Sequence, residues 1–327
     1  MRRTPAMSAA LCSILAAAAY AQVGPPVPSE GDPPVGGGES GAPAQEGEGS
    51  SEGSKVNAEL TLFGLHIFSS GFDGAAGDVS VTRIGEQLRV SVPRGDRSAF
   101  LLGFDAMHSW YEFDGATGFV TSGEPWENAT ELDFSAGYRG AIGDHWGFVV
   151  GANVNAAFET GGDFGDSLTF GGRAGFTYSS SDTLTLGLGV AVSSRLEDDV
   201  LAVPFPVLSW QVSDRWLVAS YGDSRGTGLG VSYMPNDAWT FTLRAGLGAH
   251  EFRLDETGPV PDGVGRTWHV PVEFIAAWKI DPQVTLQAGV GYEAWQQYTL
   301  DDSEGNELAE FDADPALVVG IGVEFTF

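Results

Sequence analysis

From about residue 57 to its end, the chain alternates between apolar and polar residues with a period of two. Clear examples are residues 146–155, 239–249, 268–280, 284–293 and 317–327. In the last of these, one face consists of Leu317, Val319, Ile321, Val323, Phe325 and Phe327. Because successive side chains of a strand point to opposite faces, each stretch predicts a strand with one apolar face.

The lengths and connections of these strands favour a transmembrane barrel over a soluble sandwich. The second face is mostly Gly, Thr, Asn and Gln, and the predicted strands are about 11–16 residues long, whereas soluble strands average ~5–6 residues. A tilted membrane strand needs ~9–11 residues. Short turns at 94–97, 142–144, 180–182, 213–214, 236–237 and 281–282 alternate with longer connections near 69–83, 114–126, 159–166, 196–199, 222–226, 254–265 and 301–312. Short turns at one end and long loops at the other are typical of such barrels.

Aromatic residues mark the short-turn ends of the apolar faces. The apolar-face residue nearest a short turn or the terminus is Tyr138, Trp146, Tyr178, Trp239, Trp278 or Phe327. Amphipathic rings prefer the headgroup level of a bilayer, so these positions predict a membrane-interface girdle.

The predicted fold is therefore all-β: a single transmembrane antiparallel up-and-down β-barrel of residues 57–327. We count fourteen strands, an even number that leaves both barrel ends on one side of the membrane. Pro204 and Pro206 weaken the ladder around residues 200–222 and imply a bulge or irregular rim there, which makes twelve strands the alternative.

The amino-terminal residues differ from the barrel segment in composition. Arg2 and Arg3, an alanine-rich apolar run and the small residues Ala19 and Ala21 predict a signal peptide over residues 1–21. Residues 22–56 are rich in Pro, Gly and Glu and contain no aromatic residue, which predicts a disordered linker. The sole cysteine, Cys12, falls in the signal peptide, so we expect no disulfide and no thiolate site in the mature protein.

The sequence also ends in a recognisable motif. Its last residues, GIGVEFTF, resemble the carboxy-terminal signal of bacterial outer-membrane β-barrel proteins, with Val323, Phe325 and Phe327 at the matching positions. The stretch PVLSWQVSDRWLVASYG at 206–222 is similar to an uncharacterised outer-membrane barrel family, a domain of unknown function. The resemblance implies a location in the outer membrane, contact with its lipid, and recognition of the last strand by the barrel-assembly machinery.

Following the alternation inward gives the residues expected to face the lumen. They are Arg89, Arg139, Arg173, Arg244, Glu131, Asp133, Glu273, Glu293 and Glu324. Charges of both signs in a water-filled pore would select among permeants, whereas the same charges paired across strands would only stiffen the wall. Both interpretations stay open at this point.

The overall charge narrows the possible partners. With 44 acidic and 16 basic residues, the chain carries a net charge of −28, which argues against nucleic acid as a partner. Acidic residues gather in the long loops, at 197–199, 255–262 and 301–312. Divalent cations would suit their carboxylates, but the spacing lacks an EF-hand's pattern, so we predict no specific metal site and no cofactor.

Two functions from different classes remain. The first is a passive channel or transporter for small solutes through a polar lumen, and the alternative is a structural or surface-interaction barrel with a blocked lumen and acidic extracellular loops. We expect no enzyme, because no nucleophile motif accompanies the five histidines, although His250 and His269 could meet across one connection.

Overall fold

The computed structural model describes residues 55–95, 97–120 and 123–327. The predicted signal peptide lies outside these residues, and so does the predicted linker apart from its last two positions. The described chain forms fifteen strands: β1 (Asn57–Gly71), β2 (Asp78–Pro93), β3 (Ser98–Asp114), β4 (Asn128–Ile142), β5 (Trp146–Phe158), β6 (Leu168–Ser181), β7 (Leu184–Ser193), β8 (Leu201–Ser213), β9 (Trp216–Asp223), β10 (Gly226–Asn236), β11 (Trp239–Arg253), β12 (Val264–Asp281), β13 (Val284–Asp301), β14 (Glu307–Ala313) and β15 (Ala316–Thr326).

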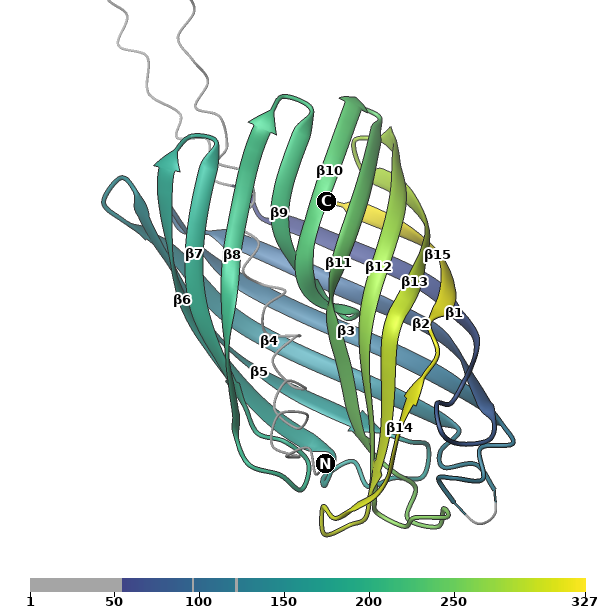
Figure 1. Cartoon of the computed structure of the whole chain (residues 1–327). Helices are drawn as coiled ribbons and strands as arrows, with labels where there is room; N and C mark the ends of the chain where they lie inside the picture. Colours follow the sequence, from purple (N-terminus) through teal and green to yellow (C-terminus); the bar gives the residue numbers. More distant parts are fainter. Residues whose placement is uncertain (1–54, 96, 121–122) are drawn as a thin grey trace, which may run out of the picture.

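These strands close into one antiparallel barrel (Figure 1). Each strand from β1 to β13 pairs with the next, and β15 pairs with both β13 and β1. Because β14 and β15 both pair with β13, they are two parts of one wall strand, interrupted at Asp314 and Pro315. The wall therefore has fourteen strands, which confirms the predicted all-β barrel and its larger strand count.

The chain terminus completes the ring. The Phe327 N–H donates to the Ala58 carbonyl at 2.8 Å, and Val323 lies opposite both Leu62 of β1 and Leu286 of β13. The alternating last strand is thus the strand that joins the two ends of the sheet.

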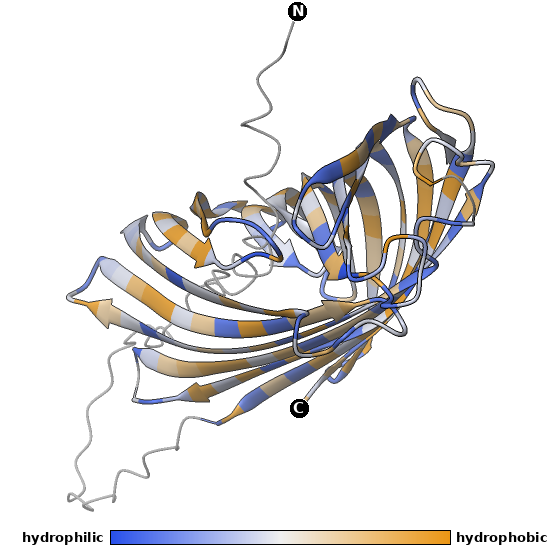
Figure 2. Cartoon of the chain, turned by 90° about the horizontal axis from the view of Figure 1, so that it is seen from below, coloured by the Kyte–Doolittle hydropathy of each residue, from blue (hydrophilic) through white to orange (hydrophobic). Residues whose placement is uncertain are grey.

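The outer surface of the barrel is apolar at mid-height. Exposed large side chains such as Leu243, Phe274 and Val290 recur at every second position, and Figure 2 shows the resulting alternation of colour along the strands. Trp146, Trp239 and Trp278 are also exposed, and Trp239 stacks with Trp278 at 5.9 Å between ring centroids. Among the described residues, no helix is long and apolar enough to cross a membrane.

At the long-loop end, the apolar residues turn inward instead of outward. Val79 and Val81 of β2 are each 1% exposed, although the sequence pattern had assigned residues 69–83 to a connection. Leu300 of β13 is also buried at the same end. The reversal arises because this end holds a packed core, so its inner face is the apolar one.

This core, hereafter the loop-end plug, fills the lumen from wall to wall. Tyr111 of β3 packs on Phe252 of β11 with ring centroids 5.9 Å apart, although five other wall strands lie between β3 and β11 on the shorter way round. Phe113 likewise reaches Tyr298 of β13 at 6.3 Å. Trp126, from the connection before β4, is 1% exposed and contacts Phe252 at 5.6 Å. A densely packed core of this kind leaves no axial path for water at this level.

Glu159 joins two long connections at the loop end of the barrel. Its carboxylate accepts the Glu127 N–H at 2.7 Å and the Asp255 N–H at 3.1 Å, and it thereby joins the connections before β4 and after β11. Burial raises the pKa of Glu159, while these two backbone hydrogen bonds act in the opposite direction.

Replacing Glu159 with alanine is expected to destabilise this end by about 2–4 kcal/mol, because two backbone donors lose their acceptor. Chemical unfolding in detergent, or hydrogen exchange of the Glu127 and Asp255 amides, measures the effect. Since the pKa of Glu159 is raised in the folded protein, its carboxyl contributes most to the free energy of unfolding at a pH below its pKa in the unfolded chain. That contribution is lost as the pH rises through the pKa of the folded protein. An equal loss of stability in Asp163→Ala, a loop carboxylate that accepts the Asp166 N–H within its own connection, would contradict this role for Glu159.

Candidate functional site in the lumen

The short-turn half of the barrel encloses two adjoining cavities. The deeper cavity, about 550 Å³, extends from the start of β1 to the tip of the β9–β10 hairpin, and we call it the vestibule. A second cavity of about 640 Å³ lies beside the short turns after β10 and β12. The two share Tyr221, Arg244, Ile275, Gln287 and Glu324 as lining residues. Water therefore has access from the short-turn end to about the middle of the barrel.

The vestibule wall carries charges of both signs. Arg139 lines it without an ion-pair partner within the described part of the chain, whereas Arg89 pairs with Asp105 at 2.7 Å. Glu324 accepts a hydrogen bond from Gln287 at 3.2 Å and lies near Glu59. An ionic solute entering here would meet fixed charges at close range, as in a selective pore.

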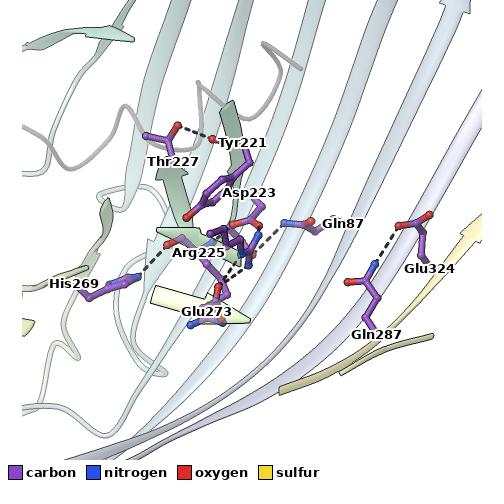
Figure 3. Close-up of polar contacts among 11 residues, drawn as sticks. Gln87, Tyr221, Asp223, Arg225, Thr227, His269, Glu273, Gln287 and Glu324 are labelled. Atoms are coloured by element: carbon purple, nitrogen blue, oxygen red, sulfur yellow. Dashed lines mark hydrogen bonds and ion pairs between the residues drawn. The ribbon is translucent and has the colours of Figure 1, made fainter. Parts of the chain in front are cut away.

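An ion-pair network closes the inner end of the vestibule (Figure 3). The Arg225 guanidinium pairs with Glu273 of β12 and lies 3.1 Å from a carboxylate oxygen of Glu293 of β13. Arg244 of β11 reaches the same Glu273 at 2.8 Å and Asp223 at 2.5 Å. The network, which we call the latch, therefore joins the β9–β10 hairpin to three neighbouring wall strands.

The hairpin tip also reaches the opposite wall. Gln87 of β2 donates to the Ser224 hydroxyl at 3.1 Å, and the Arg225 carbonyl lies 3.1 Å from Nε2 of His269. The tip thus spans the lumen from β2 to β12. Figure 3 shows Gln87 and His269 on opposite sides of Arg225.

Glycines let the tip lie directly against β11. A Cβ added to Gly248 would come within 2.1 Å of His269 and 2.4 Å of the Arg225 carbonyl. One added to Gly246 would lie 2.5 Å from the Tyr221 hydroxyl. Gly226 has φ +130°, a backbone conformation that side-chain-bearing residues rarely adopt.

A buried polar layer separates the latch from the loop-end plug. Arg83 is 2% exposed and interacts electrostatically with Glu131 and Glu293. His250 lies 2.8 Å from Glu131 and stacks on His269 at 5.2 Å between centroids. Several polar atoms here have no protein hydrogen-bond partner, including Nε of Arg83 and Oε2 of Glu293. Unpaired buried polar atoms in this number favour a hydrated layer.

The structure distributes the residues expected in the lumen over these levels. Arg89, Arg139, Arg244, Glu273 and Glu324 line the vestibule, and Glu131 and Glu293 belong to the polar layer. The Asp133 carboxylate accepts a hydrogen bond from the Asn153 amide at 2.7 Å, and Arg173 is buried farther round the wall. These two residues do not join the latch.

Sequence reasoning missed Arg225, Asp223 and Arg83. The first two lie in residues 222–226, which the sequence pattern assigned to a longer outer connection, but their turn is tight and lies inside the barrel. Arg83 fell in the misassigned connection 69–83. The unusual arginine in the short GDSRG sequence was the signal available for Arg225.

The two histidines that were expected to meet lie inside the polar layer. His250 and His269 stack on each other there, and among the described residues neither hydrogen-bonds to a serine or cysteine. Within residues 55–95, 97–120 and 123–327, no cluster of three or more His, Cys, Asp or Glu side chains could hold a metal ion.

The fold, the apolar exterior and the polar cavity together define a β-barrel of the outer-membrane type. The chain belongs to the family described as Domain of unknown function (DUF6268), whose model matches residues 127–326. No curated protein matches the sequence.

Solved structures give distant matches. A deltaS2 mutant of the TodX monoaromatic hydrocarbon channel is 12% identical, with 83% of this chain and 90% of that chain covered and a TM-score of 0.46. An outer membrane channel from Pseudomonas putida F1 is 10% identical, with 86% and 100% covered and a TM-score of 0.46. A Pseudomonas aeruginosa FadL homologue is 12% identical, with 83% and 90% covered and a TM-score of 0.46.

Proposed function

We propose that the protein is a passive outer-membrane channel for small polar solutes, and that the described conformation is its closed state. In this proposal, lipid surrounds the apolar exterior, and the assembly machinery reads Val323, Phe325 and Phe327 during insertion. The signal peptide exports the chain.

The vestibule is the observation that carries the proposal. It places Arg139, Arg244 and Glu324 around a water-accessible space of about 550 Å³, large enough for a small solute. A barrel that served only as a scaffold has no need of an open polar half. The charges that line the vestibule and the latch would favour solutes that exchange their water of hydration for ionic contacts.

The loop-end plug supports the second candidate, a blocked barrel that acts through its acidic loops. Its residues are buried as deeply as those of a soluble core, for example Phe252 and Leu300 at 0% exposure. Under this alternative the barrel never conducts, and binding resides in the loops, with divalent cations as candidate partners.

Ion selectivity separates the two candidates. In planar bilayers, the refolded chain from Gln22 onward is expected to show discrete openings. Replacing Arg139 with alanine should make those openings more cation-selective, because one fixed positive charge leaves the vestibule. Reversal potentials under a salt gradient measure the change.

Arg97→Ala provides the matched control. It removes the same charge from a short turn, where Arg97 is exposed beside Asp144. Selectivity unaltered in Arg97→Ala but shifted in Arg139→Ala supports conduction through the vestibule. Equal shifts in both variants would contradict that route.

A further inference from the structure

The wall of the barrel is incomplete between β8 and β11. β8 pairs with β9 only from Ser209 to Ser213. β10 pairs with β11 from Asn236 to Thr227, and this ladder ends where the hairpin turns at Gly226. Figure 1 shows β8 diverging from the β9–β10 hairpin away from the short turns. The long-loop part of β8, residues 201–208, therefore has a free edge on the β9 side in the described chain.

Two prolines maintain this free edge. The Leu208 N–H points toward β9, since it donates to the Ser220 hydroxyl at 3.1 Å. Every second N–H of a strand points the same way, so Pro206 and Pro204 occupy the next two positions that would have donated toward β9. The sequence thus prevents β9 from extending its ladder along β8.

On the β9 side, the β9–β10 hairpin is consequently held near its tip by side chains, whereas on the β10 side it pairs with β11 from Thr227 to Asn236. Its two strands pair with each other from Trp216 and Tyr233 to Asp223 and Gly226. On the β8 side, backbone pairing ends at Ala219. The latch and the Gln87–Ser224 hydrogen bond add side-chain attachments of the tip within the lumen.

We infer that the β9–β10 hairpin tip is a movable gate between the vestibule and the buried polar layer. In the closed position, Arg225 joins Glu273 and Glu293, and Ser224 contacts the far wall. Withdrawal toward the unpaired edge of β8 connects the two compartments. The effect on conductance rests on the proposed channel function, whereas the movement itself does not.

Thiol accessibility tests the movement without any assumption about conduction. Thr267 is 3% exposed in the polar layer, opposite His250, and Cys12 is the only native cysteine, inside the predicted signal peptide. In the refolded chain from Gln22 onward, Thr267→Cys should react slowly with a charged methanethiosulfonate. Adding Arg225→Gln should accelerate the reaction at least tenfold, because the latch is broken. Equal rates in the two folded proteins, verified by heat-modifiable gel mobility, would overturn the gate.

A reversible cross-link tests its effect on conduction. In Gln87→Cys/Ser224→Cys, a short bis-methanethiosulfonate should abolish openings, and a reductant should restore them. The two single-cysteine variants serve as controls. Openings that persist after complete cross-linking would overturn the gate while sparing the channel. If every form is silent, the proposed function fails, and the accessibility result alone decides the gate.

Discussion

Trp126→Ala is expected to lower the free energy of unfolding by about 3–5 kcal/mol and to raise the frequency of channel openings several-fold. Trp126 is 1% exposed in the loop-end plug and contacts Tyr111, Phe113, Phe119 and Phe252 with ring centroids between 5.2 and 5.9 Å. Removing the indole leaves a cavity in the packing that closes the lumen. Denaturant titration and single-channel recording measure the two effects.

Trp146→Ala is the matched control for that experiment. Trp146 is 52% exposed on the outer surface near a short turn, so the same side chain is removed without opening the plug. We expect a smaller loss of stability and unchanged opening frequency in this variant. A Trp126→Ala protein that unfolds and conducts like Trp146→Ala would show that the aromatic core is not the loop-end barrier.

Arg83→Met is expected to lower the free energy of unfolding by about 3–5 kcal/mol, because it removes the buried cation that balances the carboxylates of Glu131 and Glu293. Arg83 of β2 is 2% exposed, and its charge is balanced by Glu131 of β4 and Glu293 of β13. In the variant, Glu293 retains Arg225 as a partner, whereas the partner that Glu131 retains within ion-pair distance in the described chain is His250. The free energy of unfolding in detergent measures the cost.

The double variant Arg83→Met/Glu131→Gln tests whether charge, rather than shape, causes the loss. Removing both members of a buried pair is far less costly than removing one, so much of the stability should return. Equal destabilisation of the single and double variants would instead assign the loss to packing. No loss in Arg83→Met would contradict the role given to the polar layer.

The alternation of residues was sufficient to predict the barrel and its fourteen strands. Strands such as β12 and β13 expose one face over their short-turn halves, so their apolar residues recur at every second position on that face. The carboxy-terminal strand was predicted for the same reason. β14 was missed because its short ELAEFDA sequence is acidic and the chain is interrupted at Pro315.

The plug could not be predicted because it inverts the rule used to find strands. In the short-turn half of the barrel, apolar side chains face outward, whereas at the plug Val79, Val81 and Leu300 face inward. The same alternation fits both arrangements, and only the packing of distant loops decides between them. Trp126 belongs to a connection whose position cannot be read from periodicity.

The candidate site was predictable only in part, for a related reason. The strand phase pointed to Arg244 and Glu273, which lie opposite each other on β11 and β12. Their partner Arg225 lies in a turn, where alternation carries no information about direction. Pro204 and Pro206 were noticed as a weakness of the wall, but the inward position of the neighbouring hairpin depends on tertiary contacts.

Single-channel recording of the refolded chain from Gln22 onward, in wild-type and Trp126→Ala forms, is the decisive test of the proposed channel. Rare discrete openings are expected of the wild type, because the plug and the latch close the lumen in series, and frequent openings are expected once the plug is weakened. A folded barrel that remains silent in both forms would contradict the channel and favour a blocked barrel that acts through its loops.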